Sequence, residues 1–409
     1  MEKVTESVIQ SIGLYKKLAH GVFKNLTKGH LVIRENGNTY HFGDRGVKSI
    51  ELKVSDSNFY RKIVLKGEIG LGESFMDGDW FTDDLTAFLK LIIDNQEGLG
   101  DSSAVSEMSK RASLNFLSFV EDISHRLNHN SKDNSQKNIS YHYDLSNDFY
   151  KLWLDETMTY SSAIFKDFDE DLRKAQLRKY DNLFNALELK DGQDLLEIGS
   201  GWGGLSKRAA EHFNVNVHTV TISKEQYKYA KDLFEKNDLD NINLMFKDYR
   251  DIEGKFDNIV SCEMIEAVGD SYFDSYFKKV SDSLKSGGRF SMQGILMPSS
   301  RYQTYTKSSD WIRKYIFPGG HLPSIERLIN VAKKYNLELI KYDEYGKHYA
   351  ETLRRWRKDF YANTESVYKL GFDERFVRMW NYYLCICEAA FDTSNIYLAQ
   401  MVFKRPNED

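Results

Sequence analysis

Residues 195–205 read LLEIGSGWGGL, and this stretch decides the fold. An apolar run from Leu195 to Ile198 enters a turn rich in glycine, which is the pattern of a buried strand, a tight turn and a helix. Glycine suits such a turn because its backbone adopts positive φ and approaches a ligand closely. The first turn of the following helix presents N–H groups to a carboxylate or a phosphate. The stretch therefore predicts a ligand site at the end of a strand.

The spacing of the glycines fits two kinds of ligand. Gly199, Gly201 and Gly204 match the G-x-G-x-x-G pattern of dinucleotide-binding folds, whereas Gly199, Gly201 and Gly203 match the G-x-G-x-G turn that holds S-adenosylmethionine. A dinucleotide site also needs Asp or Glu about 20 residues further on, where it binds the ribose hydroxyls. That position reads TVTIS (219–223) and contains no acid. The missing acid weakens the dinucleotide interpretation more than the methyl-donor interpretation.

Strands and helices alternate on both sides of this stretch, which predicts an α/β fold with a mostly parallel sheet. The final strand has no helix after it, and this suits the antiparallel hairpin that ends class I methyltransferases. We therefore expect the Rossmann-like, seven-stranded sheet of that class, with an antiparallel last strand. The expected strands are 194–199, 216–222, 242–248, 256–262, 288–295, 337–345 and 396–405.

The chain before residue 140 has a different pattern. Residues 30–43 read as two short strands around Asn36-Gly37, which is a strong hairpin signal. Apolar residues recur at helical spacing in 102–127, and a polar, turn-rich linker follows. We expect a small α+β domain at 1–100, a helix and linker at 101–139, and a methyltransferase domain at 140–409.

The composition is that of an ordinary globular protein. The net charge of −5 offers no basic surplus for nucleic acid. Three cysteines without a C-x-x-C pair fit a reducing compartment, and no His, Cys or Asp spacing resembles a metal site. No apolar run reaches the roughly 18 residues that cross a bilayer, and the charged N-terminal residues predict no signal peptide. These features predict a cytoplasmic protein.

Several longer stretches resemble the cyclopropane-fatty-acyl-phospholipid synthases, and they occur in the same order as in that family. The resemblance covers nearly all of 140–409, and GESFMDGDW (72–80) is also similar to the smaller N-terminal domain of the bacterial members. It implies S-adenosylmethionine as cofactor, unsaturated acyl chains of phospholipids as substrate, and peripheral binding at the inner membrane surface. It leaves a homodimer open. The stretches are 141–165, 195–205, VTISKEQ (220–226), EMIEAVG (263–269), YIFPGGHLPS (315–324) and 348–360.

The resemblance also implies a mechanism. Methyl transfer to an alkene leaves a carbocation on the acyl chain, which aromatic faces and carboxylates can stabilise. A base that removes a proton from the new methyl group closes a cyclopropane ring. Loss of a different proton gives a methylene branch, and a hydride shift with reduction gives a methyl branch, as in branched or furan-type fatty acids. The base therefore decides the product.

In the cyclopropane synthases the base is a bicarbonate ion held at five positions, which fall here on Ser162, Glu266, Gln293, Ile295 and Tyr349. Glu266, Tyr349 and the backbone of Ile295 match the family, whereas Ser162 replaces a cysteine and Gln293 a histidine. Both replacements still donate a hydrogen bond, but glutamine does not titrate near neutral pH as histidine does. The resemblance favours ring formation and leaves open both a bound bicarbonate and a branched product.

Further residues are assigned to the ligands. For the cofactor, the glycines would line the methionine part, the residues after the second and third strands would meet the ribose and adenine, and a loop would close over the methionyl end. For the acyl chain, aromatic residues between 297 and 323 would wall a channel. The cofactor residues are Gly199, Gly201, Gly203, Thr221, Gln226, Asp248, Tyr249, Tyr160 and Ser161, and the acyl residues are Tyr305, Trp311, Tyr315 and Phe317.

Other classes of protein stay open. A lipid-binding protein with an inactive methyltransferase domain is one, although the intact glycine turn and Glu266 argue against it. A small-molecule N-methyltransferase like the plant relatives is another, which the bacterial type of N-terminal domain disfavours. For membrane docking we expect the N-terminal domain and the basic residues of the 102–127 helix, while simple packing between domains explains that helix equally well.

Overall fold

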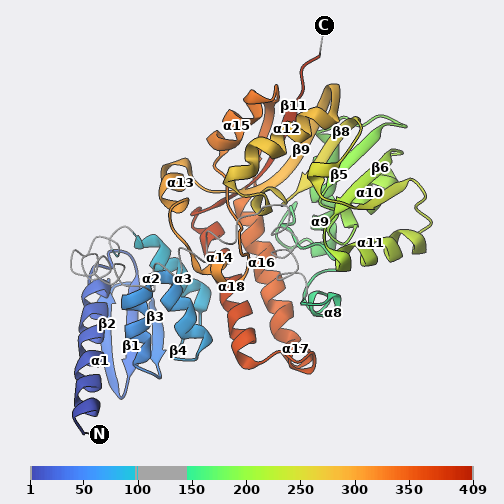
Figure 1. Ribbon diagram of the computed structural model, residues 1–409. Helices are drawn as coiled ribbons and strands as arrows, with labels where there is room; N and C mark the ends of the chain where they lie inside the picture. The colour runs from blue at the N-terminus through green and yellow to red at the C-terminus, as the bar shows by residue number, and fades with distance from the viewer. Residues whose placement is uncertain (1, 97–98, 100–144, 408–409) are drawn as a thin grey trace. The chain divides into compact units, whose positions relative to one another are not determined.

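The computed structural model describes residues 2–96, 99 and 145–407, and it divides into two compact units. The larger unit carries the glycine turn and contains residues 145–308, Phe317–Asn363 and residues 394–407. The smaller unit contains the described residues before 100, together with Ser309–Ile316 and Thr364–Thr393. Figure 1 labels the elements of both units. Each unit is described by itself.

The larger unit is built on a seven-stranded sheet with the order β10-β11-β9-β8-β5-β6-β7. The strands from β9 to β7 pair in parallel, and β11 is antiparallel to both of its neighbours. This arrangement confirms the predicted Rossmann-like sheet with its antiparallel last strand. The strand order reverses between β5 and β8, so their carboxyl ends border the crevice where such sheets bind ligands. The strands are β5 Asp194–Ile198, β6 Asn216–Thr221, β7 Ile242–Phe246, β8 Phe256–Cys262, β9 Leu284–Leu296, β10 Glu338–Glu344 and β11 Tyr397–Lys404.

Helices cover both faces of this sheet (Figure 1). Successive residues of a strand point to opposite faces, so Leu195 belongs to the core beside α9 and α10, whereas Leu196 belongs to the core beside α12 and α15. Both leucines are fully buried. The helices of this unit are α8 Asn147–Tyr150, α9 Leu172–Asn185, α10 Gly204–His212, α11 Lys224–Lys236, α12 Phe273–Ser283, α13 Ser299–Tyr305, α15 Ile325–Lys334 and α16 Gly346–Ala362.

The smaller unit has a four-stranded sheet with the order β2-β1-β3-β4. Asn36 and Gly37 both have positive φ and join β1 to β2, as the hairpin signal predicted. The strands are β1 His30–Glu35, β2 Asn38–Gly43, β3 Ser49–Val54 and β4 Trp80–Phe81, and the helices are α1 Glu2–Phe23, α2 Asn58–Met76, α3 Leu85–Asp94, α14 Trp311–Tyr315, α17 Thr364–Lys369 and α18 Glu374–Asp392.

The chain enters the smaller unit three times, whereas the sequence predicted one N-terminal segment. Trp311 of α14 is fully buried, 4.7 Å from the ring of Tyr382 in α18. A Cβ atom on Gly72 of α2 would lie 2.4 Å from the Trp311 ring, so the helix and the indole touch closely. Packing between segments far apart in sequence explains the difference, because local patterns do not say which core a helix joins.

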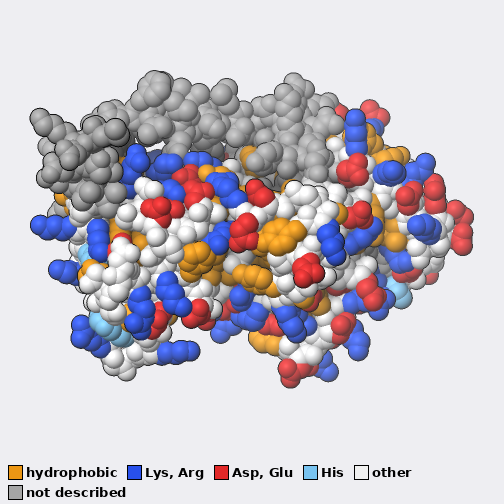
Figure 2. All heavy atoms as spheres, turned by 90° about the horizontal axis from the view of Figure 1, so that it is seen from below, with side chains coloured by type: hydrophobic (Ala, Val, Ile, Leu, Met, Phe, Trp, Pro, Cys, Tyr) orange, Lys and Arg blue, Asp and Glu red, His pale blue; other side chains and the backbone are white. Residues whose placement is uncertain are grey.

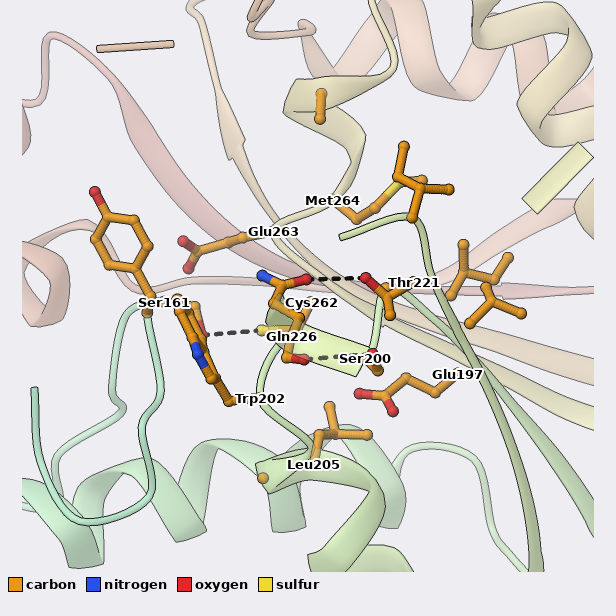
Figure 3. Close-up of a pocket in the computed structure, with 18 of the residues that line it drawn as sticks. Ser161, Glu197, Ser200, Trp202, Leu205, Thr221, Gln226, Cys262, Glu263 and Met264 are labelled. Carbon is orange, nitrogen blue, oxygen red and sulfur yellow. Dashed lines mark hydrogen bonds between the residues drawn. The ribbon is translucent and has the colours of Figure 1, made fainter. Parts of the chain in front are cut away.

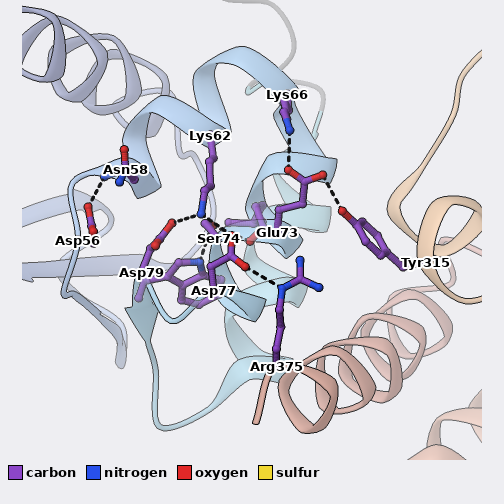
Figure 4. Close-up of polar contacts among 12 residues, drawn as sticks. Asp56, Asn58, Lys62, Lys66, Glu73, Ser74, Asp77, Asp79, Tyr315 and Arg375 are labelled. Atoms are coloured by element: carbon purple, nitrogen blue, oxygen red, sulfur yellow. Dashed lines mark hydrogen bonds and ion pairs between the residues drawn. The ribbon is translucent and has the colours of Figure 1, made fainter. Parts of the chain in front are cut away.

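Ion pairs also attach the later segments to α2 (Figure 4). Glu73 accepts hydrogen bonds from Lys66 at 2.8 Å, from Tyr315 at 2.8 Å and from Lys314 at 3.0 Å. Arg375 of α18 donates to Asp77 at 2.9 Å. These contacts assign α14 and α18 to the smaller unit independently of the apolar packing.

The predicted helix at 102–127 and the linker after it lie outside the described residues. Among the residues that are described, no helix combines the length and apolar character needed to cross a membrane. On the face seen in Figure 2, Lys and Arg side chains are interspersed with Asp and Glu, and hydrophobic side chains form small groups.

Candidate active site

The glycine turn after β5 has the backbone that its sequence predicts. Gly199, Gly201 and Gly203 all have positive φ, at 96°, 50° and 90°. A Cβ atom on Gly203 would lie 2.8 Å from the Phe234 ring, so this glycine lets the turn pack against α11. A Cβ atom on Gly201 would meet nothing within 4 Å and would occupy open space. That space is where a ligand can approach the backbone.

A pocket opens beside this turn at the carboxyl ends of β5, β6 and β8 (Figure 3). Gly203 does not line it, because it faces Phe234 instead. All other predicted cofactor residues line the pocket, so the structure brings together five separate parts of the sequence. These residues are Tyr160, Ser161, Gly199, Gly201, Thr221, Gln226, Asp248 and Tyr249.

Polar side chains at the ends of β6 and β7 are held in place. The Thr221 hydroxyl donates to Gln226 Oε1 at 3.0 Å and accepts from the Ser223 amide at 3.1 Å. Asp248 accepts two hydrogen bonds of 2.9 Å from Arg250, one from its amide and one from Nη1. The Gln226 amide nitrogen and the Asp248 carboxylate can therefore meet hydroxyl and amino groups of a nucleoside.

The centre of the predicted anion site contains a carboxylate that the sequence analysis missed. Glu263 directly follows β8, and its side chain is labelled in Figure 3. Its Oε1 accepts from the Ser162 amide at 2.9 Å and from Gln293 Nε2 at 2.8 Å. Its Oε2 accepts from the Tyr349 hydroxyl at 2.7 Å. An acid immediately after a strand that ends at the ligand crevice was the available sequence signal.

Ser162 and Gln293 serve this carboxylate in different ways. The Ser162 hydroxyl, predicted as a donor to an anion, instead donates to the Ala163 carbonyl at 3.0 Å, and only the Ser162 amide faces Glu263. Gln400 Nε2 donates to Gln293 Oε1 at 3.0 Å, which turns the Gln293 Nε2 toward Glu263. A neighbouring strand therefore fixes the orientation of the Gln293 amide.

Glu266 lies beside Glu263 and forms a partly buried acidic pair with it. Glu266 Oε1 accepts from the Ile295 amide at 2.5 Å, and Oε2 is buried without a hydrogen-bond partner among the described residues. Burial and the charge of Glu263 raise the pKa of Glu266 to about 8. Burial also raises the pKa of Glu263, but three donors and the positive charge of Lys179 oppose this effect. We assign the negative charge to Glu263 and the proton to Glu266 at neutral pH.

Lys179 of α9 is a buried cation next to the pocket, and it was also missed. Its Nζ donates to the Ser161 hydroxyl at 2.6 Å and lies 3.7 Å from Cys262 Sγ. It is fully buried. A buried charge needs partners, and Lys179 balances the ionised Glu263.

Aromatic rings surround the loop that carries Tyr160. The Tyr160 ring lies 5.3 Å from Trp153, 5.5 Å from Tyr150 and 5.5 Å from Trp356. The Trp356 ring lies 6.2 Å from that of Tyr349, which bonds Glu263. The site therefore combines a carboxylate with the Tyr160 ring, which lines the pocket. Carboxylates and aromatic faces both stabilise positive charge.

The four predicted acyl-channel residues divide between the two units. Tyr305 and Phe317 belong to the larger unit, where the Phe317 ring stacks 6.5 Å from Tyr160. Trp311 and Tyr315 belong to the smaller unit, where Trp311 is core and the Tyr315 hydroxyl donates to Glu73. The channel itself stays a prediction.

The seven-stranded sheet with its antiparallel last strand, the glycine turn and the pocket beside that turn are those of a class I, S-adenosylmethionine-dependent methyltransferase. The family model for mycolic acid cyclopropane synthetase matches residues 130–401. The chain belongs to this family, and it is an enzyme that uses S-adenosylmethionine.

Individual relatives agree with this assignment. The chain is 37% identical over 355 residues to the tuberculostearic acid methyltransferase UfaA1 of Mycobacterium tuberculosis, covering 84% of this chain and 81% of the relative. It is 35% identical over 365 residues to the cyclopropane-fatty-acyl-phospholipid synthase of Escherichia coli, covering 89% and 90%. The structure of the mycolic acid cyclopropane synthase CmaA1 complexed with SAH and CTAB matches with a TM-score of 0.62 and 29% identity, over 66% of this chain and 98% of that one.

Proposed function

We propose that this enzyme methylates the double bond of an unsaturated acyl chain in a membrane phospholipid and that the resulting cation closes to a cyclopropane ring. The observation that carries the proposal is the partly buried pair Glu263 and Glu266, which adjoins the cofactor pocket and the aromatic cluster around Tyr160. The similarity to the Escherichia coli phospholipid enzyme, which extends over 90% of that protein, supports the substrate class.

The chain's own residues can supply what this reaction needs. S-adenosylmethionine, when bound, supplies an electrophilic methyl group. Gly201, Thr221, Gln226 and Asp248 would hold it, since they meet in one pocket and leave space beside the Gly201 backbone. Positioning of the alkene in line with the methyl group can contribute ~7–11 kcal/mol. The aromatic faces exclude water, and together with the Glu263 charge they stabilise the cation.

A second candidate product is a methylene- or methyl-branched acyl chain. The 37% identity to a tuberculostearic acid methyltransferase supports it, and so does Gln293 at the position where the resemblance expects histidine. The methylene branch does not form by loss of a different proton, as the sequence analysis expected. It forms when a hydride shift in the same cation is followed by loss of a proton from the new methyl group. A saturated methyl branch needs a reductant as well.

We also propose that the enzyme works as a peripheral protein at the inner membrane surface. The chemistry of the substrate supports this, because the acyl chain of a phospholipid stays in the bilayer. A homodimer remains a prediction.

The test is to incubate the enzyme with S-adenosylmethionine carrying a labelled methyl group and vesicles of monounsaturated phosphatidylethanolamine and phosphatidylglycerol. We expect label in the acyl chains and a gain of one CH2 per double bond, with the upfield proton resonances of a cyclopropane ring. Vesicles with saturated chains are the matched control and should stay unlabelled. Vinylidene protons would favour the methylene branch, and absence of label from the lipid would contradict the proposed function.

A further inference from the structure

We propose that Glu263 is the proton-accepting base of this enzyme and that it works without an exchangeable anion such as bicarbonate. The inference rests on the proposed function, since it concerns the step that follows methyl transfer. Three observations carry it: the occupied donors, the backbone of Glu263, and the division of charge within the acidic pair.

The groups predicted to hold a bicarbonate ion already have partners. The Ser162 amide, Gln293 Nε2 and the Tyr349 hydroxyl all donate to Glu263. The remaining two of the five positions are Ile295 and Glu266, and the Ile295 amide donates a hydrogen bond to the Glu266 carboxyl group. A separate anion would find these donors taken and would face two partly buried carboxyl groups. Bicarbonate therefore does not fit this site, and the Glu263 carboxylate takes its position.

The backbone holds Glu263 in an uncommon conformation for this purpose. Its φ is +49°, a region that glycine adopts freely and that other residues seldom enter. The Glu263 amide donates to the Gln293 carbonyl at 2.8 Å, which fixes the residue at the end of β8. Such a conformation persists when surrounding contacts determine it, and it is concentrated at functional sites. Here it directs the carboxylate toward Gln293 and Tyr349.

The charge of the pair suits proton transfer. Three hydrogen-bond donors and the positive charge of Lys179 favour the ionised form of Glu263 against its burial, whereas burial and the charge of Glu263 favour the protonated form of Glu266. Among the described residues, Glu263 Oε2 accepts one hydrogen bond, from Tyr349, and a carboxylate oxygen has room for a second. The same residue lines the cofactor pocket. An ionised oxygen with a lone pair to spare thus lies where the cation forms.

The step balances without another reagent. A C–H bond of the new methyl group breaks, and its electron pair forms the C–C bond that closes the ring. After a hydride shift, the same electron pair instead forms the C=C bond of a methylene branch. The proton passes to a Glu263 carboxylate oxygen, which neutralises the cation and the carboxylate together. Release of that proton to solvent restores the ionised residue.

The experiment measures methyl transfer to monounsaturated phospholipid vesicles in buffer that is freed of carbon dioxide, before and after bicarbonate is added back. We expect the wild-type rate to change less than twofold. Glu263→Gln keeps the size of the side chain and should lower kcat about 100-fold or more, the usual loss for a general base. The exposed Glu253→Gln is the matched control and should leave the rate unchanged.

Glu263→Gly extends the test, because glycine adopts this φ freely and the variant vacates the anion position. We expect it to lose activity as Glu263→Gln does and to recover at least tenfold when bicarbonate or formate is added. Binding of S-adenosylhomocysteine, measured by calorimetry, shows that each variant is folded.

The outcomes separate the two proposals. A wild-type enzyme that labels lipid only when bicarbonate is present overturns the role of Glu263 and leaves the proposed function intact. A Glu263→Gln variant whose kcat lies within tenfold of the wild-type value also overturns the role of Glu263 and leaves the proposed function intact. If a variant fails to fold, the wild-type measurement alone decides. A wild-type enzyme that labels no lipid under either condition overturns the proposed function and the inference that rests on it.

Discussion

Replacement of Tyr349 by phenylalanine tests how the carboxylate is held. The Tyr349 hydroxyl donates to Glu263 Oε2 at 2.7 Å, and the tyrosine is buried. A hydrogen bond to a charged group contributes about 1.5–3 kcal/mol, which corresponds to a factor of about 10–150 in rate. Because Tyr349→Phe removes only one oxygen atom, we expect kcat to fall by up to that factor, with the largest loss at low pH, where the ionised form of Glu263 is scarcest.

The pH profile of Tyr349→Phe identifies the cause of the loss. Without the hydroxyl the ionised form of Glu263 is less stable, so its pKa rises. The loss of kcat relative to wild type should therefore be largest at low pH and should shrink as the pH rises through the raised pKa of Glu263. The assay is kcat against pH on monounsaturated vesicles. A profile parallel to that of wild type would refute the reasoning, since a purely structural defect lowers the rate equally at every pH.

The matched control for this variant is Tyr342→Phe. The Tyr342 hydroxyl also donates to a glutamate, Glu344, at 2.6 Å, but that pair is exposed on β10. Exposed pairs of this kind contribute little because water competes for both partners. We expect Tyr342→Phe to retain the wild-type rate and pH profile.

Further predictions concern stability and cofactor binding. Gly203→Ala adds a Cβ atom 2.8 Å from the Phe234 ring. The control Gly254→Ala stands at a similar positive φ, and its Cβ atom would have no neighbour within 4 Å. In denaturant unfolding, Gly203→Ala should be less stable than Gly254→Ala by about 1–3 kcal/mol. Glu266 has a pKa of about 8 in the folded protein against 4.5 ordinarily, so the stability it contributes is complete below pH 4.5 and is lost as the pH rises to about 8. Glu266→Gln cannot ionise, and its melting temperature should therefore depend less on pH across that range; an unchanged slope would contradict the assignment of the proton. Gln226→Ala should weaken binding of S-adenosylhomocysteine about tenfold in calorimetry through the loss of a neutral hydrogen bond, and equal affinity would remove Gln226 from the cofactor site.

The sequence predicts the larger unit well because its signals are local. Alternating strands and helices and the glycines at 199, 201 and 203 specify a parallel sheet and its ligand crevice, and the structure confirms both. The Asn36-Gly37 hairpin is predicted for the same reason. In each case a short run of residues determines the backbone by itself.

The directions of side chains are harder to predict from the sequence. Glu263 was missed because the resemblance assigned five anion-binding positions, and nothing in a linear sequence shows that a sixth residue reaches the same donors. The Ser162 hydroxyl turns to the Ala163 carbonyl, which residue type alone does not reveal. Trp311, which was predicted to line a channel, packs on Gly72, more than 200 positions away in the sequence, and no local pattern shows this contact. Contacts of this kind depend on the tertiary fold.

The threefold passage of the chain through the smaller unit has a consequence for synthesis on the ribosome. The first hundred residues leave the ribosome early, but α14 and α18, which complete their core, end at Tyr315 and Asp392. Domains that fold during translation normally do so from the N-terminal side. The core of this unit cannot be completed until α18 has been made, and the surface that receives Trp311 stays uncovered until α14 has been made. No single cut in the gene would release it as an independent fragment.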